Sequence, residues 1–373
     1  SWSSAASDVY KRQLLVITPE KESIDEKNIL AYIYKDGQLL EKRVLSNPSQ
    51  LLSADRTVED ERPDILYSKR SYSTVLPWNY VENGLSLRFE TYDMREGELA
   101  ADSIEFGPPT HLEMPMVRVG MMTEPPAAKP LETRMANYGS ELFQRLPLAS
   151  LSISPYLPVK LDKVVTAYGE VEQEYSQFEE PDIHSGDLRE NITKSLIQTG
   201  INNANFGVPS TAGTHQWQPA HFPTVVIGHS IGRYLNKKGE VVDVTHGASG
   251  GNGMVLLVDS TGNEVTHEIG HAFSLWHYPG GPDVYYHSTT SGWGYDAYRG
   301  RMADNVVWYN RGYDGRDFKG LVGYQKDPMA GGNFDSNSNN YPLFTGYTSK
   351  VAQDYLATYD LLDLSLIHIS EPT

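Results

Sequence analysis

Three histidines and one glutamate lie close together in this sequence, as His267, Glu268, His271 and His277. If the first three lie on a helix, His267 and His271 share one face, because residues four apart are one turn apart. Two imidazoles at that spacing can bind the same Zn²⁺ ion. Glu268 then lies beside them, within reach of a water molecule on the metal.

His277 follows His271 by six residues. Six residues are about 1.7 helical turns, so His277 cannot share the helical face of the other two. It can join them only if the chain turns sharply after the second ligand. Three nitrogen ligands would then leave a fourth position for water, which is the catalytic type of zinc site. The pKa of that water would fall to about 7, and Glu268 would take its proton as it attacks a carbonyl group.

A helix over residues 265–274 is needed to position these groups. Its opposite face is apolar, because Val265, Ile269 and Phe273 recur every four residues and can anchor the helix in a core. Asn263 is the expected N-cap of this helix. One helix can therefore supply two ligands, a base and its own packing face.

The composition limits the classes of partner. The 373-residue chain has 39% hydrophobic residues, a net charge of −17 and no cysteine. Its length suffices for two domains. The negative charge argues against nucleic-acid binding. The sequence has no apolar run of about 18 residues, so we expect no membrane insertion. Disulfides and cysteine-ligated zinc are excluded. The oligomeric state is not defined by the sequence.

Both ends of the chain look foreign to the fold. Residues 1–13 and 365–373 resemble translated sequencing-adaptor sequence and are not expected to belong to the fold. On this interpretation His368 is not a candidate ligand. The absence of a signal peptide then carries no information about localisation.

Residues 14–108 read as a β-rich domain. Two apolar stretches flank Lys35-Asp36-Gly37, which is a hairpin signal. Residues 85–92 alternate apolar and polar side chains, as a half-buried strand does. Short strands of this kind predict a small β-sandwich.

Residues 109–364 read as a second domain, which follows a boundary at Pro108-Pro109. The patterns predict a mixture of strands and helices. The expected strand is 114–122, and the expected helices are 132–146, 187–199 (stopping near Gly200) and 351–362.

A rival interpretation rests on Gly228–Gly232, which has the Gly-x-Ser-x-Gly pattern of a nucleophile elbow after a strand. Ser230 would be the nucleophile of a serine hydrolase, with Asp259 and a later histidine completing the triad. An elbow needs a helix after the second glycine, but a turn at residues 236–239 follows and a strand resumes at Val241. A β-hairpin is the better prediction.

A third interpretation is a non-catalytic, zinc-containing module. Its aromatic loops at residues 279–325 would hold glycans. The intact Glu268 argues against it, because a pure binding module has no need of a base.

Residues 264–278 resemble the zinc-binding motif of the metzincin metalloproteases. The chain is most similar to the StcE-like, TagA-related family of secreted bacterial zinc metalloproteases. That resemblance covers roughly residues 110–362 and is carried by several further segments. They are Ser249–Met254, Asp259–Glu268, Gly292–Asp296, Asp327–Gly332 and Phe344–Thr348.

The resemblance implies an α+β fold, with a metzincin-like zinc metalloprotease domain after a β-sandwich-like domain. It also implies that His267, His271 and His277 bind zinc and that Glu268 is the general base. Met329 corresponds to the methionine of the Met-turn, a structural floor under the ligands. The resemblance further implies that the protein is secreted and that its substrates are O-glycosylated, mucin-like proteins.

Tyr278 and Ser274 lie close in sequence to His277. Tyr278 is a candidate to stabilise the oxyanion formed during hydrolysis, and local packing is its alternative role. Ser274 stands where metzincins usually have glycine, three residues after the second histidine. If its backbone is left-handed, serine costs about 1 kcal/mol relative to glycine.

Overall fold

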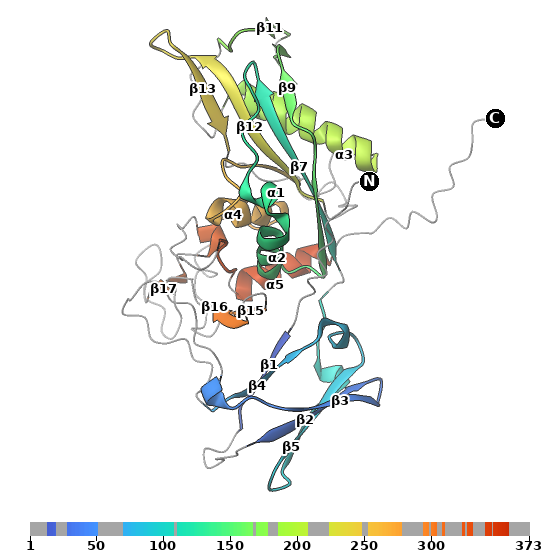
Figure 1. Ribbon diagram of the computed structural model, residues 1–373. Coiled ribbons are helices and arrows are strands. Elements are labelled where there is room, and N and C mark those ends of the chain that lie inside the picture. Colours follow the sequence, from blue (N-terminus) through green and yellow to red (C-terminus); the bar gives the residue numbers. More distant parts are fainter. Residues whose placement is uncertain are drawn as a thin grey trace, which may run out of the picture.

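The computed structural model describes most of the chain, and the statements below concern that part. It comprises residues 13–19, 28–50, 70–107, 110–166, 169–177, 186–207, 224–247, 253–277, 294–297, 300–303, 308–309, 323–324, 327–330, 340–344 and 346–357. The protein is a mixed α/β structure with several sheets and few helices (Figure 1). Residues 1–12 and 365–373 lie outside the described part, whereas Gln13 is the first residue of a strand.

The N-terminal strands form two antiparallel sheets around one apolar cluster. The larger sheet has the order β3-β2-β5-β6, and β1 pairs with β4. The predicted hairpin between β2 and β3 is confirmed, and its turn places Asp36 and Gly37 at φ +48° and +79°. Residues of both sheets, including Ile33, Leu87 and Leu76, share the cluster. The elements are β1 Gln13–Ile17, β2 Ile29–Lys35, β3 Gln38–Val44, η1 Pro48–Gln50, β4 Tyr72–Leu76, η2 Trp78–Tyr80, β5 Leu85–Thr91, β6 Glu96–Leu99 and η3 Ala101–Ser103.

The central sheet is mostly parallel. Its central strands β7 and β12 pair in parallel. β8 and β9 pair one after the other along the outer edge of β7, and β14 and β13 do the same along the outer edge of β12. Only the β12–β13 pair of this sheet is antiparallel. The strands are β7 His111–Met121, β8 Ser150–Pro155, β9 Val159–Leu161, β12 Val226–Leu235, β13 Val241–His246 and β14 Met254–Leu256.

Side chains of β7 alternate between two buried clusters, as the two-residue period of a strand requires. Met114 and Met116 pack in one cluster with residues of α2, α4 and α5. Val117 and Val119 pack in the other with residues of η4. The sheet is therefore covered on both faces (Figure 1). The helices are α1 Pro130–Thr133, α2 Met135–Arg145, η4 Leu188–Gln198 (a π-helix), α3 Thr199–Phe206, α4 Asn263–Ala272, η6 Pro328–Ala330 and α5 Gly346–Leu356.

Short two-stranded sheets complete the described elements. β10 Val164–Val165 pairs with β11 Val171–Glu172. Two further pairs are β15 Gly294–Asp296 with β16 Arg301–Ala303, and β17 Trp308–Tyr309 with β18 Gly323–Tyr324. None of the described helices combines the length and apolar character needed to cross a membrane.

Several helix boundaries differ from the prediction. The C-terminal helix, expected over 351–362, is α5 Gly346–Leu356. The expected helix 132–146 is split at Arg134, whose φ of −132° is not helical. The predicted stop at Gly200 is wrong, because α3 continues to Phe206 and ends at Gly207 in the left-handed region (φ +71°). A Cβ on Gly200 would meet nothing within 4 Å. This glycine lies within the helix. It makes the helix about 1 kcal/mol less stable than alanine would, but it does not end it.

The pattern around Ser230 has a packing explanation. β12 runs unbroken through it as one arm of a hairpin with β13, so a strand-to-helix elbow is not formed there. A Cβ on Gly232 would lie 2.8 Å from Leu188 of η4, and one on Gly228 would overlap Gln198 of the same helix. The two glycines therefore let η4 approach the strand closely. Ser230 is fully buried between them.

Candidate metal centre

The histidine-bearing helix α4 begins at Asn263, so this residue is the first residue of the helix and not its cap. Gly262 is its N-cap, so the predicted capping role of Asn263 is wrong. The carboxylate of Glu264 instead bonds the loop before the helix, accepting from the backbone N–H groups of Val258 at 2.8 Å and Asp259 at 3.2 Å. The predicted apolar anchors Val265 and Ile269 are fully buried in the core. The helix is therefore held by its side chains on the inner face and by Glu264 at its start.

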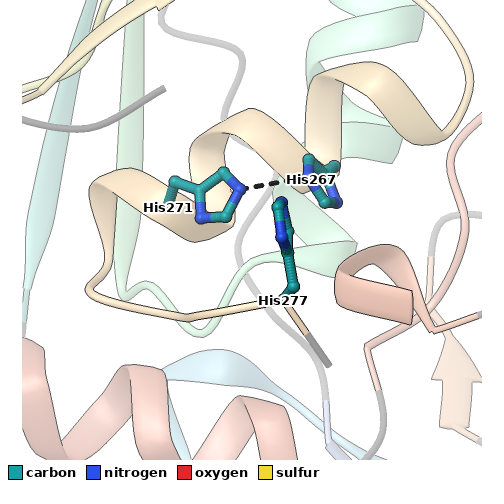
Figure 2. Close-up of side chains that lie close together, drawn as sticks. All are labelled: His267, His271 and His277. Atoms are coloured by element: carbon teal, nitrogen blue, oxygen red, sulfur yellow. Dashed lines mark hydrogen bonds between the residues drawn. The ribbon is translucent and has the colours of Figure 1, made fainter. Parts of the chain in front are cut away.

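The chain turns sharply directly after α4, as the third histidine requires. The backbone N–H of Ser274 bonds to the carbonyl of His271 and that of Leu275 to the carbonyl of Gly270, both at 3.0 Å. These two bonds form a Schellman motif. Ser274 has a φ of +64°, so its backbone is left-handed and carries the cost relative to glycine given above. The motif ends the helix and turns the chain back toward the face that carries the ligands (Figure 2).

The turn brings the three histidine side chains together (Figure 2). One nitrogen from each of His267, His271 and His277 lies within 4.8 Å of the others, and the three can hold a metal ion. The ring centroids are 4.6 Å apart for His267 and His271 and 5.0–5.3 Å for the pairs with His277. His277 is exposed, while the other two are partly buried. The cluster is therefore partly open to solvent.

Two of the imidazoles are oriented by backbone carbonyls. His267 Nδ1 lies 2.6 Å from the carbonyl of Pro328, and His271 Nδ1 lies 2.7 Å from that of Leu275. A carbonyl only accepts, so each Nδ1 carries the proton and each Nε2 presents a lone pair. Outer hydrogen bonds of this kind fix the tautomer of metal-binding histidines.

The two Nε2 atoms lie 3.1 Å apart. Two lone pairs facing each other repel unless a cation lies between them. Burial lowers the pKa of His267 to about 4, which argues against a proton in that position. In a tetrahedral zinc site with bonds of about 2.0–2.1 Å, two ligand nitrogens are about 3.3 Å apart. The donor set and its spacing therefore fit a metal ion.

Met329 packs against the helix that carries His267 and His271. It lies in η6, is 1% exposed and belongs to the same buried cluster as Ile269. A Cβ on Gly270 would overlap its sulfur atom. Gly270 lies between the ligand turns of α4, so the absence of a side chain there lets Met329 reach the helix. The position matches the floor that the sequence resemblance implies for this methionine.

Glu268 is 5% exposed beside the histidines. Burial raises its pKa to about 7; the charge of Glu264 also raises it, while Lys194 and Arg189 lower it. A carboxyl group with a pKa near the working pH suits a general base. Burial and Arg189 in turn lower the pKa of Lys194, while Glu268 raises it. The two cationic residues on η4 were not predicted from the sequence, where no motif marks them.

Tyr278, the predicted oxyanion stabiliser, lies outside the described residues. Its role stays a prediction.

Comparison with known proteins identifies the family. The peptidase M66 family matches residues 61–359. The chain belongs to the peptidase M66 family. It is 31% identical over 348 residues to the ToxR-activated gene A lipoprotein of Vibrio cholerae serotype O1, covering 89% of this chain. It is 30% identical over 331 residues to metalloprotease StcE of Escherichia coli O157:H7, covering 83% of this chain.

These matches confirm the StcE-like, TagA-related resemblance seen in the sequence. The matched family is one of peptidases, and one of the two relatives is named a metalloprotease. The matches span about a third of the length of these relatives, 34% in each case.

Proposed function

We propose that this chain is a zinc-dependent endopeptidase whose metal is held by His267, His271 and His277. The observation that carries the proposal is the pair of Nε2 lone pairs 3.1 Å apart, each set by a carbonyl behind its ring. Three imidazole nitrogens as donors favour zinc among the common biological metals. Two of them are kept neutral at physiological pH, because burial lowers the pKa of His267 and His271.

A zinc ion bound there would supply Lewis acidity, which acidifies water and polarises a carbonyl group. The chain's own contribution is the base. The carboxylate of Glu268 takes the proton from the attacking water and passes it to the leaving amine. Its surroundings favour this exchange, since a pKa of about 7 allows the group both to accept and to donate a proton near neutral pH.

We further propose a metzincin-like protease domain over residues 109–364 that follows a sandwich-like domain over residues 14–108. The first supporting observation is that the apolar cluster of the N-terminal sheets is separate from the two clusters of the central sheet. The Met329 turn beneath the ligands is the second support.

For the substrate we propose O-glycosylated, mucin-like proteins, on the strength of the family resemblance. For the location we propose the bacterial surface or the extracellular space. One relative is named a lipoprotein, which supports export.

The test is zinc content together with proteolysis, for wild type and Glu268→Gln. We expect one zinc in both proteins, cleavage of an O-glycosylated mucin by wild type alone, and slower cleavage of unglycosylated casein. Equal cleavage by both proteins would contradict the role of Glu268. Wild type without zinc would contradict the metal site. Equal rates on mucin and casein would contradict only the glycoprotein preference.

A further inference from the structure

The C-terminal segment, residues 340–344 with α5, contacts the parts of the chain that hold α4 on both sides. On one side is the loop before α4, and on the other is the η6 turn under the ligands. The contacts on the η6 side begin at the hydroxyl of Thr348 on α5 and end at the imidazole of His267. The inference drawn from them rests on the proposed function, because it concerns the same metal centre.

The hydroxyl of Thr348, on α5, donates to Asp327 Oδ2 at 2.8 Å. Asp327 is fully buried and Thr348 is 2% exposed. The other oxygen of Asp327, Oδ1, accepts from the backbone N–H of Met329 at 2.9 Å. The Asp327 side chain thus bonds its own backbone two residues on, which is an Asx-turn that shapes the η6 segment. Thr348 fixes the rotation of the carboxyl group that makes this turn.

Between these two anchor points lies Pro328, the residue whose carbonyl orients His267. Its oxygen is 2.6 Å from His267 Nδ1. Because Asp327 and Met329 flank Pro328, the bond between them determines where that carbonyl points. The series of contacts is therefore Thr348, Asp327, the Pro328 carbonyl and His267, and no step is longer than 2.9 Å.

The same segment also holds the start of α4. The carbonyl of Asn340 accepts from the backbone N–H of Gly262, the N-cap of α4, at 2.7 Å. Asn340 is held in turn by both carboxylate oxygens of Glu141, each at 2.6 Å. Tyr341 donates to the carbonyl of Ser260 at 2.9 Å. With this end of the helix fixed, a shift of the η6 turn changes the bond to His267 instead of moving the whole helix.

We propose that Thr348 is a positioning residue of the metal centre, which sets the orientation of His267 through Asp327 and the Pro328 carbonyl. The C-terminal helix thereby contributes to metal affinity without touching the metal. Loss of an outer-shell partner of a metal-binding histidine typically weakens metal binding about 10- to 100-fold. Because Thr348 acts through two intermediates, we expect roughly tenfold weaker zinc binding when its hydroxyl is removed.

The test measures the zinc dissociation constant by competition with a chromogenic chelator, on the full chain. Thr348→Val removes the hydroxyl at nearly constant volume, and Thr348→Ser retains it. Ser349→Ala removes a half-buried hydroxyl from the next position of the same helix and is the matched control. We expect roughly tenfold weaker binding for Thr348→Val, and near wild-type values for Thr348→Ser and Ser349→Ala.

Urea unfolding of the metal-free proteins separates positioning from simple stability. A purely structural hydroxyl would lower the unfolding midpoint of Thr348→Val and leave the zinc dissociation constant unchanged, and that result would overturn the inference. If Thr348→Val fails to fold, Thr348→Ala against Thr348→Ser isolates the same oxygen atom. Wild type that binds no zinc would overturn the proposed function itself, whereas equal zinc affinities for wild type and Thr348→Val overturn only the role of Thr348.

Discussion

Replacing Gly270 with alanine tests the packing under the metal centre. The new Cβ would overlap Met329 Sδ and lie 3.3 Å from Met329 Cε and 3.4 Å from Leu275 Cδ1. Met329 is 1% exposed, so its side chain has little free space into which it can move. Inserting a methyl group into such a site costs about 1–3 kcal/mol. The better helix propensity of alanine returns about 1 kcal/mol.

The matched control is Gly200→Ala. Gly200 also lies within a helix, but a Cβ there would meet nothing within 4 Å. Gly200→Ala should therefore gain only from the better helix propensity of alanine and should stabilise the protein by about 1 kcal/mol. The propensity term cancels between the two variants. Their difference in unfolding free energy should equal the overpacking term, about 1–3 kcal/mol, with Gly270→Ala the less stable.

The assay is urea unfolding of both variants and wild type in the presence of a chelator, followed by zinc titration of the folded proteins. Movement of Met329 would also disturb the adjacent Pro328 carbonyl, so Gly270→Ala should bind zinc more weakly than Gly200→Ala. If both variants were stabilised equally, Met329 would not pack against α4 as described, and the reasoning would be refuted.

Three further predictions concern the turn, the buried histidines and the metal. Ser274→Gly should raise the unfolding free energy by about 0.5 kcal/mol, because relief of about 1–2 kcal/mol of left-handed strain exceeds the added entropy of the unfolded chain; a lower urea midpoint would contradict it. Burial lowers the pKa of His229 and His246 to about 4 in the folded state, against about 6.5 when unfolded. Their contribution to stability is therefore complete above pH 6.5 and falls as the pH drops toward 4, by up to about 3 kcal/mol each; a stability profile with the same slope in His246→Asn as in wild type would count against this. Chelation should lower the melting temperature and added zinc should restore it, since saturation at about 100 times the dissociation constant is worth about 2.7 kcal/mol; an unchanged melting temperature would argue against a metal-stabilised fold.

Local patterns in the sequence were sufficient for the local features of the site. The four-residue spacing of Val265 and Ile269 predicted the buried face of α4, and both are fully buried. The same spacing placed His267 and His271 on the other face. The need for a sharp turn after His271 followed from the six-residue spacing to His277, and the left-handed Ser274 lies in that turn. Helical periodicity and turn conformation depend on neighbouring residues, which is why the sequence reveals them.

Patterns failed where a distant segment determined the outcome. The hairpin at Gly228–Gly232 was predicted correctly, but the reason for its two glycines, the packing of η4 against β12, comes only from the structure. Gly200 and Gly207 look alike in sequence, yet only Gly207 ends the helix. Asn263 has the side chain of an N-cap, but Gly262 occupies that place.

By itself, the sequence identified three candidate metal-binding histidines and the helix that carries two of them, and it required a sharp turn to bring the third beside them. Tertiary structure decided how those groups are tuned. The carbonyl that orients His267 comes from Pro328, 61 residues away, and the hydroxyl that supports this turn comes from Thr348 on another helix. The raised pKa of Glu268 results mainly from burial. Orientation and burial depend on long-range contacts, which a local pattern of residues does not encode.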